Sequence, residues 1–197
     1  MPTAKNNSND LPIKLFKNQN MWEIWLSKNF GTSAGLWLRL SKKSSKIKCI
    51  SYQEALDIAL CYGWIDGQKK KFDEDTWIQR FTVRGSKSIW SKINRAKALD
   101  LIKQGRMQSA GINAIEIAKK NGRWDAAYDS HRTAEPPAEL LNAFKEHPAA
   151  KEFFETLNSQ NKYAILFRIQ TAQSPSTREK RIAKFISMLE KHEKLYP

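Results

Sequence analysis

Basic and aromatic side chains are interleaved along residues 64–95 in a pattern that could bind an anionic ligand. Cations can neutralise phosphates, and aromatic rings can stack on unpaired bases, each stack contributing about 1–3 kcal/mol in proteins that bind single strands. This chemistry predicts a binding face for a polyanion, with nucleic acid as the first candidate. The candidate binding residues are Trp64, Asp66, Lys69, Lys70, Lys71, Trp77, Arg80, Arg84, Trp90, Lys92 and Arg95.

The same stretch has a second interpretation that needs no ligand. The aromatic rings can belong to the hydrophobic core, and the lysines can protect an exposed edge strand from aggregation. The arginines can pair with nearby carboxylates. Both interpretations stay open when only the residue types and their spacing are known.

The charge of the chain supports a search for an anionic partner. The net charge is +14, from 34 Lys and Arg against 20 Asp and Glu, and a surplus of eight positive charges falls within residues 35–97. Strongly basic proteins commonly meet nucleic acid or anionic lipid headgroups. Because lysine and asparagine are abundant throughout, a compositional bias could produce the total without a partner, so the argument depends on the local clustering.

A pocket is the alternative use of this region. Asp66, at a corner between a helix and a strand, could act as a general base or bind a cation, with Trp64, Arg80 and Trp90 lining a small-ligand or enzyme site. A catalytic carboxyl needs a pKa shifted by burial or by a neighbouring charge. The ordinary alternative for Asp66 is a turn residue whose side chain bonds to local backbone.

Common catalytic and metal-binding motifs are absent from the sequence. His131, His147 and His192 are far apart, and Cys49 and Cys61 belong to no paired ligand motif. The sequence also lacks GxGxxG, a Walker A motif and GxSxG. We therefore expect no metal and no cofactor and assign no catalytic residue. A binding protein without enzymatic activity is favoured, and an enzyme stays the alternative.

Hydrophobic periodicity and capping signals predict an α+β fold: a small antiparallel sheet with a central hairpin covered by helices, plus a C-terminal helical module. Ser51 and Glu54 form a capping box at the start of one helix, and Ser176 and Glu179 form a second. The predicted strands are 35–41, 64–72 and 76–83, the last two joined by the acidic turn 73–75. The first predicted helix starts near residue 20. The other predicted helices cover residues 51–62, 91–104, 109–121, 137–146, 148–157, 159–172 and 177–192.

Pro136 and Pro137 close a stretch without periodicity, which predicts the main boundary of the chain. We expect a disordered or extended segment at 1–19, an α+β domain with a basic hairpin at 20–128, a linker at 129–137 and a helical module at 138–197. The apolar stripes of the module should meet in one cluster. They comprise Leu140, Leu141, Phe144, Phe153, Phe154, Leu157, Tyr163, Leu166, Phe167, Ile182, Phe185, Ile186 and Leu189.

The sequence also bears on location. It has neither the apolar run of a signal peptide near its start nor a stretch long enough to span a membrane, and its two cysteines are ordinary for a reducing compartment. We therefore expect a cytoplasmic protein without a transmembrane segment. Its oligomeric state cannot be predicted from these features.

Several short blocks resemble a known family. They include Gly-Trp-Ile-Asp-Gly at 63–67, Trp-Ser-Lys-Ile-Asn at 90–94 and Thr-Arg-Glu-Lys-Arg-Ile-Ala-Lys at 177–184. From about Trp22 to His192 the chain resembles the YdeI/OmpD-associated (bacteriocin-protection, OmdA-type) family. The resemblance implies a link to bacteriocin protection or to an outer-membrane porin. It thereby adds the hypothesis of an envelope-stress protein that acts through protein contacts, and it supplies no catalytic residues.

Overall fold

The computed structural model describes residues 11–197, so most of the segment predicted to be disordered or extended lies outside the described residues. The chain divides into two compact units, each discontinuous in sequence. The first comprises Met1–Ser88 and Ala96–Asn121, and the second comprises Ile89–Arg95 and Gly122–Pro197. The predicted linker 129–137 therefore lies inside the second unit, and the predicted division into domains stays a prediction.

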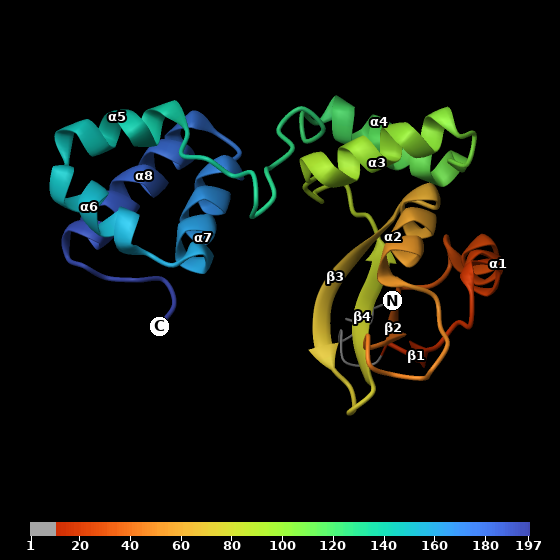
Figure 1. Ribbon diagram of the computed structural model, residues 1–197. Helices are drawn as coiled ribbons and strands as arrows, with labels where there is room; N and C mark the ends of the chain where they lie inside the picture. Colours follow the sequence, from red (N-terminus) through yellow and green to blue (C-terminus); the bar gives the residue numbers. More distant parts are fainter. Residues whose placement is uncertain (1–10) are drawn as a thin grey trace, which may run out of the picture. The chain divides into compact units, whose positions relative to one another are not determined.

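A four-stranded sheet forms the centre of the first unit, with the strand order β1-β2-β4-β3 (Figure 1). Its strands are β1 (Ile13–Lys14), β2 (Leu36–Ser41), β3 (Trp64–Lys71) and β4 (Thr76–Val83). β1 lies parallel to β2, whereas β2, β4 and β3 pair antiparallel. The α+β fold class and the three predicted strands are confirmed. The two-residue strand β1 was missed because it is too short to show an alternating pattern.

One face of the sheet is apolar because side chains alternate along a strand. Leu36, Leu38 and Leu40 of β2 are at most 2% exposed, and Phe81 of β4, opposite Leu36, is fully buried. On β3 the register shifts between Asp66 and Lys69, so that two residues of β3 lie opposite Arg80 alone. This irregularity is a β-bulge, which commonly redirects the side chains around it.

Helices α1 (Gln19–Asn29) and α2 (Tyr52–Cys61) complete this core. Trp22 of α1 is fully buried, and its Nε1 donates to the carbonyl oxygen of Ala55 at 3.0 Å, which joins the two helices. The predicted capping box of α2 is confirmed: Ser51 Oγ accepts from the backbone N–H of Glu54, and the Glu54 carboxylate accepts from that of Ser51. Each helix therefore has a defined start and a buried stripe.

Helices α3 (Lys92–Lys103) and α4 (Ser109–Lys120) follow β4, and the boundary between the units falls within α3. The start of α4 approaches the end of α2 closely at two glycines. A Cβ at Gly111 would lie 2.4 Å from the Cys61 carbonyl oxygen, and a Cβ at Gly63 would lie 2.7 Å from that of Ala110. Only glycine leaves room for this contact between backbones.

Besides the start of α3, the second unit contains the helices α5 (Ala138–Glu146), α6 (Pro148–Thr156), α7 (Ser159–Gln170) and α8 (Pro175–Glu190) (Figure 1). Their apolar stripes meet in one cluster, as predicted, and Phe153 packs against its edge. Three residues are exceptions: Leu141 is 47% exposed, and Tyr163 and Phe167 lie outside the cluster, where Phe167 contacts both Tyr163 and Tyr128. The predicted second capping box is wrong, since Ser174 rather than Ser176 caps α8 by accepting from the backbone N–H of Thr177.

A fully buried polar residue, Asn161, attaches the end of the chain to α7. Its Oδ1 accepts from the backbone N–H groups of Leu195 and Tyr196, each at 3.0 Å, and its Nδ2 donates to the carbonyl oxygen of Tyr196. A buried amide is stable only when its donors and acceptors are paired. The tail that follows α8 therefore belongs to the packed structure of this unit.

Candidate functional site

Strand β3 is an edge strand of the described sheet and carries three exposed lysines in a row. Because neighbouring side chains point to opposite faces, the row is divided between both faces of the sheet. Lys69 Nζ lies over the Trp77 ring, 4.3 Å from its centroid, and Lys70 Nζ lies 4.7 Å from the centroid of Trp37 on the other face. Each ammonium gains from the negative face of a ring without losing its access to solvent.

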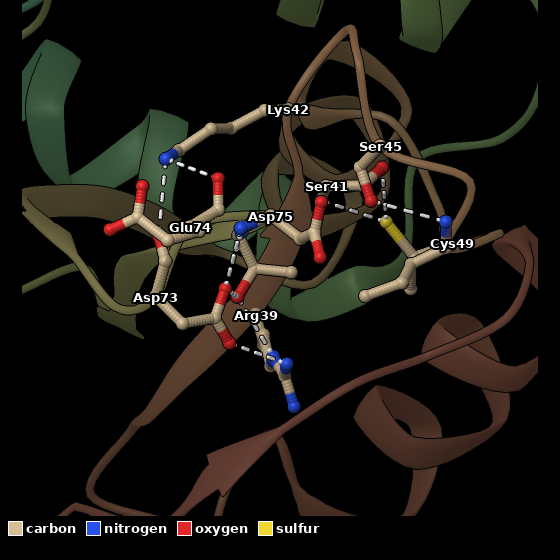
Figure 2. A network of polar contacts seen from close by, with 10 residues as sticks. Arg39, Ser41, Lys42, Ser45, Cys49, Asp73, Glu74 and Asp75 are labelled. Carbon is tan, nitrogen blue, oxygen red and sulfur yellow. Dashed lines mark hydrogen bonds and ion pairs between the residues drawn. The ribbon is translucent and has the colours of Figure 1, made fainter.

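The acidic turn between β3 and β4 is held by a network of polar contacts (Figure 2). Asp73 Oδ1 accepts from the hydroxyl and the N–H of Thr76 and from the N–H of Asp75, while Asp73 Oδ2 lies 2.7 Å from an Arg39 nitrogen. The Thr76 hydroxyl, followed by these backbone donors and the charge of Arg39, holds the pKa of the Asp73 carboxyl below its usual range. This carboxylate therefore has a structural role.

The same turn is tied to the lysine-rich loop that follows β2. Lys42 Nζ donates to the carbonyl oxygens of Asp73 and Glu74 at 3.1 and 2.7 Å, as Figure 2 shows. The Glu74 carboxylate is in turn paired with Lys71 at 2.8 Å. Lys42 and Lys71 thus meet at one residue, which brings the loop and the lysines of β3 to the same end of the sheet.

Five lysines around this end have no carboxylate partner among residues 11–197: Lys43, Lys46, Lys48, Lys69 and Lys70. All five are exposed. We call this set the lysine surface. The loop that carries three of them is closed by Cys49, whose Sγ lies 3.2 Å from both the N and the Oγ of Ser41 (Figure 2). Two of the three carboxylates of the acidic turn, Asp73 and Glu74, are paired within the fold, so the turn leaves most of these charges uncompensated.

Asp66 and Arg80 do not form the predicted pocket together, because they lie on opposite faces of the sheet. Asp66 is opposite Phe81, the neighbour of Arg80 in β4. Its carboxylate accepts from the Tyr52 hydroxyl at 2.8 Å. The Arg80 guanidinium packs over Gly67, where a Cβ would lie 3.1 Å from Nε, and this buried Nε has no hydrogen-bond partner in the described structure. The Asp66 carboxylate therefore bonds to the Tyr52 side chain, whereas the interpretation of Asp66 as a turn residue predicted a bond to local backbone.

Two of the candidate tryptophans are core residues, which corrects the expectation that they bind a ligand. Trp64 is fully buried, and its Nε1 donates to the carbonyl oxygen of Phe30 at 3.0 Å. Trp90 is 2% exposed and packs edge-on against Trp124, with ring centroids 4.9 Å apart. Because their large rings contribute most when they leave water, these positions stabilise the two units and are closed to a stacking base. Trp77 alone of the three is partly exposed.

The remaining candidates are engaged within the fold. Arg84 is 9% exposed, and its backbone N–H donates to the Gly63 carbonyl oxygen. Lys92 pairs with Asp129 at 2.8 Å, and Arg95 donates to the carbonyl oxygen of Trp124 at 3.0 Å. Trp90, Lys92 and Arg95 belong to the second unit, so the eleven candidates do not form one site within either unit.

The lysines of the 42–48 loop were missed as site residues. Their density is visible in the sequence, but only the pairing of Ser41 with Thr76 places this loop beside the turn of the hairpin. Among residues 11–197, no three His, Cys, Asp or Glu side chains are grouped so that they could hold a metal ion. Within the same range, no helix has the length and apolar character needed to cross a bilayer.

The two cysteines should differ sharply in reactivity. Cys61 is 3% exposed, and burial raises the pKa of its thiol to about 11, so at pH 8 only about one thiol in a thousand is ionised. We expect a maleimide at pH 8 to label the half-buried Cys49 at least about a hundredfold faster than Cys61. Mass spectrometry of timed samples measures both rates, with the urea-unfolded chain as the control. Equal rates in the folded protein would contradict the assignment of Cys61 to the core.

Comparison with known proteins divides the chain into two matched stretches. Residues 14–114 match the family described as "Domain of unknown function (DUF8412)", and residues 133–192 match the family described as "Bacteriocin-protection, YdeI or OmpD-Associated". Neither a curated protein nor a solved structure matches the chain. The predicted resemblance to the YdeI/OmpD-associated family is confirmed for the second stretch. The first stretch, to which the resemblance was expected to extend, matches the other family.

Proposed function

We propose a function from the geometry of the site, because the chain belongs to the DUF8412 family and the description of that family names no activity. The family model covers just over half of the 197 residues. The protein binds nucleic acid, without enzymatic activity, through phosphate contacts at the lysine surface. The observation that carries the proposal is the set of five exposed lysines without carboxylate partners at one end of the sheet. A row of such charges attracts a polyanion because binding releases its condensed counterions.

The distribution of charge supports this assignment. The first unit contains 20 Lys and Arg against 10 Asp and Glu, whereas the second contains 14 against 10. In the acidic turn beside the lysine surface, Asp73 and Glu74 are bound to Arg39 and Lys71, which leaves Asp75 as the one carboxylate of the turn without an ion pair among residues 11–197. One carboxylate neutralises little of a surface of five lysines.

The mode of contact follows from the burial of the aromatic rings. Trp64 and Trp90 are closed to solvent, and one face of Trp77 is covered by the Lys69 ammonium. Recognition by base stacking, the usual basis of tight binding to unpaired strands, has little support here. Contacts to phosphates carry no sequence information, so we expect binding that depends strongly on salt and weakly on sequence. The alternative of a small-ligand or enzyme pocket is disfavoured because Asp66 and Arg80 lie on opposite faces.

The test is to change Lys69, Lys70 and Lys71 to Gln together and measure binding of a fluorescent DNA duplex by anisotropy. For the unchanged protein we expect log Kd to rise linearly with log salt between roughly 50 and 300 mM. The variant should bind at least about tenfold more weakly at the lowest salt, with a salt slope smaller by about 2 to 3. A second variant, in which Lys43, Lys46 and Lys48 become Gln, should show the same direction of change.

The matched control replaces three exposed lysines of the second unit, Lys180, Lys184 and Lys191, by Gln, which removes the same net charge. It should keep the affinity and slope of the unchanged protein within about twofold. If the lysines only protect the edge strand, the duplex will not bind, and the Lys69/Lys70/Lys71 variant will aggregate instead. The proposal is also wrong if control and test variants lose affinity equally, or if only vesicles with anionic headgroups bind.

A further inference from the structure

A groove of about 400 Å³ runs between α5 and α8 of the second unit. None of the residues that line it belongs to the lysine surface. Glu139 and Ala143 of α5 and His147, which directly follows α5, line it at spacings of four residues. From α8 it is lined at spacings of three and four residues by Glu179, Ile182, Ala183, Ile186, Ser187 and Glu190. One face of each helix is therefore turned toward the groove, because residues at these spacings share a helix face.

The charges of the groove are arranged at its two ends. Arg178 bridges to Glu139 at 3.0 Å, and His147 bridges to Glu190 at 2.8 Å, so the two helices run in the same direction. Glu139 and Glu179 consequently lie at one end, while His147 and Glu190 lie at the other. Over the rise of an α-helix, Glu179 and Glu190 are about 17 Å apart.

Apolar side chains form the floor between these ends. Ile182 and Ile186 are 8% and 4% exposed, and the small side chains of Ala143 and Ala183 leave the surface hollow above them. None of the residues that line the groove is a Lys or an Arg. The groove thus combines an apolar floor with carboxylates at both ends, in a chain whose net charge is +14. Glu139 and Glu190 are each in contact with one basic side chain, Arg178 and His147, whereas Glu179 has no ion pair among the described residues.

We propose that this groove binds an amphipathic helical segment of a protein partner, with an apolar side chain on the floor and Lys or Arg residues near both ends. The spacing argues for a segment and against a small cation, because only a ligand about three turns long reaches both acidic ends. Docking of an apolar helix face into a groove, with charged residues at its margins, is a common mode of peptide recognition. The net positive charge of the whole chain repels a basic segment, so the attraction must come from the carboxylates of the groove itself.

The experiment uses the full chain and a labelled helical peptide of Leu and Lys, about 18 residues long, with its Lys residues on one face. Anisotropy should show saturable binding, and the same peptide with Glu in place of Lys should bind at least about tenfold more weakly. Ala183→Arg, which fills the groove with a cation, should weaken binding at least about tenfold. Glu179→Lys, which reverses one end, should weaken it about three- to tenfold.

Two matched controls lie on α6, outside the groove. Ala149→Arg and Glu152→Lys make the same changes at exposed positions and should leave the affinity within about twofold of the unchanged protein. Circular dichroism checks that each variant is folded. If Ala183→Arg is unfolded, Glu179→Lys still tests the proposal. The proposal is overturned if the Leu/Lys peptide does not bind, if its Glu counterpart binds equally well, or if the α6 variants weaken binding as much. Self-association that Ala183→Arg abolishes would overturn it too, because the occupant would then be a second copy.

Discussion

Phe185→Ala is expected to lower the free energy of unfolding of the second unit by about 3–5 kcal/mol, the range found when a fully enclosed phenyl ring is removed. Phe185 is 2% exposed and lies in the cluster formed by α5, α6, α7 and α8. The loss is large because surrounding side chains only partly refill the cavity. Since small domains are stable by only about 5–15 kcal/mol, the variant should approach unfolding at physiological temperature.

Hydrogen exchange of the full chain in increasing urea measures this effect, because it reports protection in α7 and α8 separately from the first unit. Leu141→Ala is the control: Leu141 belongs to the predicted apolar stripe of α5, but it is 47% exposed, and the substitution should cost less than about 1 kcal/mol. Similar losses for both variants would mean that the packing of α5 and α8 differs from the structure described here.

Gly63→Ala should destabilise the first unit by about 2–5 kcal/mol, since two independent costs add at this position. The residue has φ of +70°, where a side chain costs about 1–2 kcal/mol. Its Cβ would also lie 2.7 Å from the Ala110 carbonyl oxygen, and such overpacking typically costs about 1–3 kcal/mol. The backbone of α4 must shift to make room, so the contact between α2 and α4 should loosen.

Two other glycines of the first unit separate these costs. Gly105 has φ of +69° but nothing within 4 Å of a Cβ, so Gly105→Ala should show the conformational cost alone, about 1–2 kcal/mol. Gly31 has neither constraint, and Gly31→Ala should stay within about 0.5 kcal/mol. Urea unfolding of the three variants measures the loss in free energy of unfolding, which should be largest for Gly63→Ala and smallest for Gly31→Ala. If Gly63→Ala costs no more than Gly105→Ala, the close approach of α4 has no energetic consequence.

The sequence by itself determined the features that depend on neighbouring residues along the chain. Helix spacing, the capping box of Ser51 and Glu54 and the acidic turn at 73–75 all appear in the structure because each depends on backbone and side chains within a few residues. The apolar stripes after Pro137 fixed most of the second core for the same reason. The cap of α8 was misplaced because two serines near its start offer the same local chemistry, and only Ser174 has the geometry.

The tertiary structure alone decided which charges face one another and which rings are closed to solvent. Trp64 and Trp77 look alike in the sequence, yet one lies at the centre of the core and the other lies under Lys69. Asp66 and Arg80 were placed on opposite faces by the pleat and by a bulge that the sequence does not reveal. The 42–48 loop came to the hairpin turn through the pairing of β2 with β4. The pairs of β2 with β4 run from Ser41 with Thr76 to Leu36 with Phe81 and join distant parts of the sequence. Their geometry depends on the register of the sheet, which local patterns do not specify.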